Sequence, residues 1–112
     1  MALTNPDYSV LNHEEMAKAI GLKAKHIPIL VGSFIEESTP ILEKLAKAIE
    51  AKEYQEIQSL AHSIKGSAGN LRFAELSEMA KEMEHAGAAA DESFEYGAYL
   101  AAIQGAMGTI SL

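Results

Sequence analysis

Residues 60–70 read LAHSIKGSAGN, and the spacing of the apolar side chains in and around this stretch decides the fold. The apolar residues recur at every third or fourth position, which is the period of an α-helix with one buried face. They are Ile57, Leu60, Ala61, Ile64, Ala68 and Leu71. At about 100° per residue they fall within an arc of about 100°, which is enough for a single buried stripe. We therefore predict a helix from about Tyr54 to Asn70.

His62 lies on the opposite face of this predicted helix. Helical geometry places it about 150° from the centre of the stripe, so its imidazole is expected to be exposed. Gln58, Lys65, Gly66 and Gly69 share its side. Each glycine costs about 1 kcal/mol relative to alanine inside a helix. Two such glycines beside one histidine indicate a surface that is open to a binding partner, with the Lys65 ammonium near enough to pair with an anion on the ring.

The rest of the chain carries the same helical period, and no strand-like alternation interrupts it. Asn12 followed by Glu15 matches a capping box, which opens a short helix that runs to Ile20 and stops at Gly21. The other expected helices run from about Lys25 to Ala51, from Ala74 to Ala86 before a stop at Gly87, and from Asp91 or Ser93 to Met107.

Pro40 falls inside the longest of these predicted helices. A proline in a helix interior removes one hydrogen bond and commonly produces a kink. Alternatively, Ser38 or Thr39 could cap a new helix that begins at Pro40. We favour one helix, kinked at Pro40, because the apolar stripe keeps its phase on both sides of the proline.

These elements predict an all-α fold, an antiparallel four-helix bundle with a short extra N-terminal helix. The chain has 112 residues, which is enough for one hydrophobic core. We therefore expect a single domain over residues 1–112, in which residues 1–11 form an extended lead-in.

Composition excludes several classes of function. Nine basic and sixteen acidic residues give a formal charge of −7, and Arg72 is the single arginine, so a nucleic-acid-binding role is not expected. No apolar run approaches the length that spans a membrane. The chain contains no cysteine, and its first ten residues lack the pattern of a signal peptide. Together these features favour a cytoplasmic protein.

The motif His62-Ser63-Ile64-Lys65-Gly66, followed by small residues at 67–69, resembles the H-x-x-K-G signature of histidine-containing phosphotransfer (HPt) domains. These are four-helix modules whose histidine relays a phosphoryl group between aspartates of response-regulator receiver domains. The resemblance extends from about residue 21 to about residue 110. It implies that His62 is the phosphorylated residue and that Lys65 offsets the charge of the phosphoryl group.

The stretch is also similar to the phosphotransfer domain of chemotaxis histidine kinases. The position in that domain that matches Glu84 holds a glutamate, which hydrogen-bonds the phosphorylated histidine ring. Helical counting places Glu84 about 80–90° from the centre of its own apolar stripe, at an edge where a neighbouring helix can pass. We therefore predict Glu84 as the third site residue beside His62 and Lys65.

The resemblance implies a phosphorelay intermediate that acts as a monomer and carries a transient phosphohistidine. Its partners would be receiver domains and a histidine kinase, and the receiver would supply Mg²⁺ while this chain binds no cofactor. No ATP-binding region is expected within 112 residues, so the chain is not expected to be an enzyme that phosphorylates itself. Two alternatives remain, a detached phosphotransfer domain of a chemotaxis-type kinase and a helical adaptor without the chemistry.

A metal site is not expected. Glu82 and His85 form a Glu-x-x-His sequence, which is half of the motif found in di-metal helical bundles. Such a site needs a second copy, and no other histidine of the chain follows an acidic residue at this spacing. His85 is interpreted instead as a positive group near the C-terminal end of its helix, where the helix dipole favours it.

Overall fold

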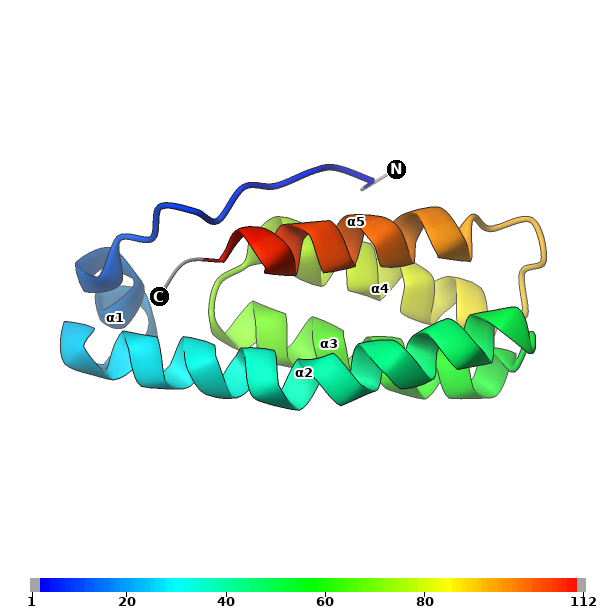
Figure 1. Ribbon diagram of the computed structural model, residues 1–112, viewed down its shortest axis with the longest axis horizontal. Helices are drawn as coiled ribbons and strands as arrows, with labels where there is room; N and C mark the ends of the chain where they lie inside the picture. The colour runs from blue at the N-terminus through cyan, green and yellow to red at the C-terminus, as the bar shows by residue number, and fades with distance from the viewer. Residues whose placement is uncertain (1–2, 111–112) are drawn as a thin grey trace.

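The computed structural model describes residues 3–110, and within this range all the regular elements are helical. They are α1 (His13–Ile20), a 3₁₀ turn (Ala24–His26), α2 (Ile27–Glu50), α3 (Tyr54–Asn70), α4 (Ala74–Ala88) and α5 (Tyr96–Thr109). Helices α2 to α5 lie side by side and alternate in direction, and α1 lies across one end of the bundle (Figure 1). The predicted all-α bundle is confirmed. Residues 1–2 and 111–112 of the predicted domain lie outside the described residues.

The short helix α1 begins and ends as its sequence predicts. The Asn12 side chain accepts a hydrogen bond from the Glu15 backbone N–H at 3.0 Å, and Gly21 ends the helix with a φ of 76°. That left-handed conformation favours glycine, which has no Cβ. The Arg72 guanidinium donates to the Ala19 carbonyl at 3.2 Å, so the turn between α3 and α4 holds the end of α1.

Helix α2 runs without interruption through Pro40. The prediction of one long helix is confirmed, and the alternative of a new helix at Pro40 is wrong. The Thr39 hydroxyl donates to the Ile35 carbonyl within the helix at 2.8 Å instead of capping a new one. Ser38 is buried at 2% exposure, in phase with the apolar stripe. The apolar stripe therefore keeps its phase through the proline, and the predicted kink at Pro40 stays a prediction.

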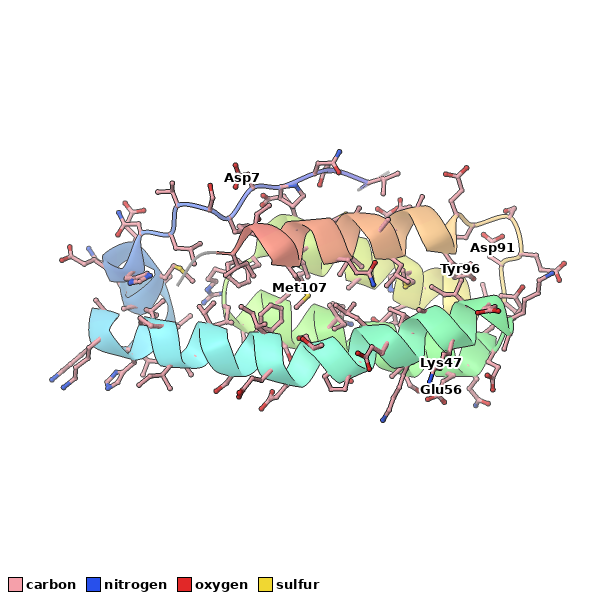
Figure 2. The ribbon with its side chains drawn as sticks, viewed as in Figure 1. Asp7, Lys47, Glu56, Asp91, Tyr96 and Met107 are labelled. Carbon is pink, nitrogen blue, oxygen red and sulfur yellow. The ribbon has the colours of Figure 1, made fainter. Side chains whose placement is uncertain are left out.

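One hydrophobic core fills the space between α2, α3, α4 and α5. Apolar side chains at helical spacing on the last two helices are buried. They are Leu76, Met79, Ala80 and Met83 on α4, and Tyr96, Tyr99, Leu100, Ile103 and Met107 on α5. Figure 2 shows Tyr96 and Met107 near opposite ends of α5, both directed into the bundle.

The connection between α4 and α5 differs from the prediction. Helix α4 continues through Gly87 to Ala88, so the predicted stop at Gly87 is wrong. Helix α5 begins at Tyr96, later than Asp91 or Ser93, so the predicted start is also wrong. The Asp91 carboxylate accepts hydrogen bonds from the backbone N–H and the hydroxyl of Ser93, at 2.9 and 2.6 Å. These local bonds stabilise a turn in place of the first turn of a helix.

Residues 3–11 precede α1 as an extended segment that passes beside α5 (Figure 1). Tyr8 attaches this segment to the bundle. Its backbone N–H donates to the Thr109 hydroxyl at 2.8 Å, and its ring lies 4.6 Å from that of Phe73. Its hydroxyl accepts a hydrogen bond from the Leu76 N–H at 3.3 Å. Phe73, the residue before the first turn of α4, provides no side-chain cap for the helix. Tyr8, from a distant part of the chain, therefore satisfies one of the backbone N–H groups that the first turn of α4 leaves free.

Candidate functional site

The imidazole of His62 projects from the middle of α3, with its side chain 64% exposed. The predicted outward orientation is therefore confirmed. Its Nδ1 atom lies 2.7 Å from Oε2 of Glu84, which comes from the neighbouring helix α4. Two helices thus contribute to one contact between residues 22 positions apart in the chain.

Glu84 also contacts Lys65, another of the predicted site residues. Its other carboxylate oxygen, Oε1, lies 2.7 Å from Nζ of Lys65, so one carboxylate joins the ring and the ammonium. The Glu84 side chain is 13% exposed and that of Lys65 is 29% exposed. The three charged or chargeable groups therefore form one cluster at the surface of the α3–α4 pair, with the histidine its most exposed member.

The electrostatics of this cluster determine how the ring is protonated. Burial raises the pKa of the Glu84 carboxyl, but hydrogen bonds from Lys65 and His62 and the charges of these partners lower it more. The pKa of Glu84 therefore lies below its ordinary value, and the group is ionised at neutral pH. A carboxylate can only accept a hydrogen bond, so Nδ1 of His62 must donate its proton. In a neutral ring this leaves the lone pair on Nε2, the nitrogen that Glu84 does not contact.

The tight turn between α3 and α4 brings these residues together. The connection runs through residues 71–73, with Leu71 buried and Arg72 at a positive φ of 66°. The Phe73 N–H closes the turn on the Ala68 carbonyl at 3.0 Å. The two helices then run antiparallel with their apolar stripes facing the core, which places the edge of α4 that holds Glu84 beside His62.

The three residues predicted to line the binding surface have different surroundings. Gly66 is exposed, and a Cβ built there would have no heavy atom within 4 Å. Gly69 is half-buried, and its Cβ would lie 3.3 Å from the Ser77 hydroxyl of α4. Gln58 is half-buried, with its backbone close to Gly87. The open space beside His62 is therefore at Gly66, while Gly69 and Gln58 adjoin the contact between the two helices.

Two residues of this contact were missed by sequence reasoning. The Ser77 hydroxyl donates to the backbone carbonyl of Lys65 at 2.9 Å. Gly87 is buried, and its Cβ would lie 3.0 Å from both the Gln58 nitrogen and the Tyr54 oxygen. A usable signal existed for Gly87, which follows Met83 by four residues and continues the apolar stripe. Nothing in the sequence marks Ser77, because its partner is a backbone group on another helix.

The comparison with known families agrees with the architecture and the site. Residues 29–109 match the Hpt domain family, and this match covers most of the chain, including α3 and α4. The chain therefore belongs to the Hpt domain family, whose members are helical phosphotransfer modules that interact with response regulators and kinases. Searches among curated proteins and among solved structures give no match.

Across residues 3–110, no group of three or more His, Asp and Glu side chains could hold a metal ion. In the same part of the chain, no helix is both long enough and apolar enough to cross a membrane.

Proposed function

We propose that this Hpt domain is a phosphorelay intermediate that accepts a phosphoryl group on His62 and passes it to an aspartate of a receiver domain. The observation that carries the proposal is the 2.7 Å contact between His62 Nδ1 and the Glu84 carboxylate. The contact directs the nucleophilic Nε2 of an exposed ring toward solvent, where a partner can approach. We further propose that the module acts as a cytoplasmic monomer.

In the proposed reaction, the lone pair of His62 Nε2 attacks the phosphorus of an aspartyl phosphate. A nitrogen–phosphorus bond forms, the phosphorus–oxygen bond to the aspartate breaks, and its electron pair leaves with the aspartate as a carboxylate. The ring becomes a cation because Nδ1 keeps its proton, and the adjacent Glu84 carboxylate stabilises that charge. In the return step a receiver aspartate attacks the phosphorus, and the electron pair of the breaking bond returns to Nε2.

Lys65 and Gly66 have supporting roles in this proposal. Phosphoryl transfer depends mainly on positioning and on neutralising the charge of the phosphoryl oxygens. The Lys65 ammonium, held beside the ring by Glu84, can move to those oxygens once the phosphoryl group is on Nε2. Gly66 leaves the approach to the ring free of side-chain atoms. The receiver partner would supply Mg²⁺ and the aspartate.

A second candidate is a phosphotransfer domain that receives its phosphoryl group from the ATP-binding domain of a chemotaxis-type kinase. The Glu84 carboxylate on the His62 ring favours it, because the similar chemotaxis domain holds a glutamate at the matching position. Incubation with ATP and a separate kinase ATP-binding domain distinguishes the two candidates. A relay intermediate would instead be loaded by a phosphorylated receiver domain.

The main test uses a receiver domain phosphorylated by a small-molecule donor, followed by mass spectrometry of this chain. We expect one added phosphoryl group on His62 that is lost in acid. His62→Gln should abolish phosphoryl acceptance while leaving thermal stability nearly unchanged, because the side chain is exposed.

The matched control is His85→Gln, which changes a different exposed histidine, one that lies on α4 and not on α3. This variant should accept phosphoryl groups at the wild-type rate. Acceptance by His62→Gln at the wild-type rate would contradict the proposal. Phosphorylation at one of the other three histidines would contradict it as well.

A further inference from the structure

Gly87 lies where α4 packs directly against the backbone of α3. It is buried one helical turn after Glu84, and its Cβ would lie 3.0 Å from the Gln58 nitrogen and from the Tyr54 oxygen. Both neighbours are backbone atoms of a packed helix, so neither can move aside alone. A side chain at this position would therefore move α4 away from α3 by a few tenths of an ångström or more.

A second contact holds α4 against α3 on the other side of Glu84. The Ser77 hydroxyl donates to the Lys65 carbonyl at 2.9 Å, seven residues before Glu84 on the same helix. Seven residues are two helical turns, so Ser77 and Glu84 share one face of α4. Gly69 leaves room for Ser77, because its Cβ would lie 3.3 Å from the serine oxygen. Glu84 thus lies between two places where the helices are held close together.

The His62 ring depends on this spacing for its orientation. Within residues 3–110, its one polar partner is Glu84, and 64% of its side chain is exposed. A ring this exposed has little packing around it, and within the described residues no second hydrogen bond fixes it. A carboxylate that must contact both His62 Nδ1 and Lys65 Nζ at 2.7 Å tolerates little separation of the two helices.

We propose that Gly87 is a positioning residue for phosphoryl transfer, because its missing side chain sets the α3–α4 separation at which Glu84 contacts both His62 and Lys65. This inference rests on the proposed function of His62. It assigns Gly87 no contact with substrate. The residue acts through Glu84, and its effect on the reaction should disappear when the Glu84 carboxylate is removed.

The test compares Gly87→Ala and Gly87→Val with Gly105→Ala. Gly105 is an exposed glycine of α5, and a Cβ there would have no heavy atom within 4 Å. Because small misplacements of catalytic groups slow reactions steeply, we expect transfer to fall about threefold in Gly87→Ala and about tenfold in Gly87→Val. Gly105→Ala should transfer the phosphoryl group at the wild-type rate. All rates are measured under conditions in which circular dichroism shows that each variant is folded.

Two further readouts separate positioning from general destabilisation. Nitrogen NMR of the His62 ring should place the proton on Nδ1 in the wild type and distribute it over both nitrogens in the Gly87 variants. In a Glu84→Ala background, Gly87→Ala should have no further effect on the transfer rate. An unchanged transfer rate and an unchanged ring proton in folded Gly87→Ala would overturn the inference.

The experiments distinguish a failure of the proposed phosphoryl transfer from a failure of the positioning role of Gly87. If the wild type accepts no phosphoryl group, the proposed reaction is wrong, and the ring NMR still tests whether Gly87 controls the His62–Glu84 contact. If the wild type transfers and both Gly87 variants match it, only the positioning role is wrong. An equal loss of rate from Gly87→Ala with and without the Glu84 carboxylate would also overturn the positioning role.

Discussion

Two glycines near His62, one on α3 and one on the facing helix α4, differ in what an added side chain would meet. On the outward side, at Gly66, a Cβ would meet open space. On the side that faces α4, the Cβ of Gly87 would meet the α3 backbone at 3.0 Å. Glycine therefore leaves open space beside the ring on one side and allows close packing of two helices on the other. The same residue type has opposite consequences because one neighbour is solvent and the other is a packed helix.

The largest effect is expected from removing the carboxylate that α4 places beside His62, which is that of Glu84. Glu84→Ala should slow transfer by about 10- to 100-fold, by analogy with the loss seen when a metal-ligating histidine loses the group that orients its ring. Receiver affinity, measured by titration calorimetry, should stay near that of the wild type because Glu84 is 13% exposed. Glu84→Gln serves as the comparison, since its amide oxygen can still accept a hydrogen bond from Nδ1. In a relay intermediate it should keep much of the activity.

Two outcomes would change this interpretation. A large loss of transfer in Glu84→Gln would favour the chemotaxis-kinase type of module, in which the negative charge itself is needed. Wild-type transfer in Glu84→Ala would mean that the contact with His62 has no part in the reaction.

The outward side is tested by filling the open space. Gly66→Leu should leave the domain as stable as the wild type or more stable by about 0.8 kcal/mol, because leucine is the better helix former. It should nonetheless weaken receiver binding and slow transfer about tenfold by crowding the approach to Nε2. Surface plasmon resonance with a receiver domain measures the first effect and single-turnover transfer measures the second. Gly105→Leu, on the exposed face of α5, is the control.

If Gly66→Leu kept both the affinity and the rate, Gly66 would have no role in partner access. The comparison between the two sides of α3 would then hold for packing alone.

The smallest expected effect concerns stability and pH. The pKa of Glu84 lies below its ordinary value of 4.5, so its ion pair with Lys65 and its hydrogen bond with His62 stabilise the folded state fully above about pH 4.5. This stabilisation is lost as the pH falls through the lower folded-state pKa. The wild type should therefore unfold at a higher temperature than Glu84→Gln at neutral pH, by the equivalent of about 1 kcal/mol or less. Calorimetry from pH 7 to pH 3 should show the difference shrinking, and a constant difference would contradict the pKa direction.

The helices and the three site residues could be predicted because each depends on a pattern within one segment. The apolar stripe gave α3 its observed limits of Tyr54 and Asn70, and the same periodicity carried α2 through Pro40. The exposure of His62 follows from its phase on the helix. Glu84 was found through a family resemblance together with its place at the edge of a stripe.

The predictions were incomplete where a residue depends on a neighbour from elsewhere in the chain. A glycine at position 87 resembles a helix stop in the sequence, but α4 continues through it, and the backbone of α3 lies so close that an added Cβ would be crowded at 3.0 Å. The start of α5 was placed too early because the Asp91 side chain bonds to Ser93 and forms a turn. The Ser77 bond to the Lys65 carbonyl depends on the packing of two helices, which no local pattern encodes.

The attachment of Tyr8 has a consequence for how this folding unit is delimited. The match to the Hpt domain family begins at residue 29, yet the hydroxyl that caps the Leu76 N–H of α4 comes from Tyr8. The same residue bonds to Thr109, 101 positions later in the chain. A protein fragment cut at the family boundary would begin α4 without this cap and would expose the ring of Phe73 that Tyr8 covers. The smallest piece that keeps these contacts at the start of α4 therefore begins before Tyr8.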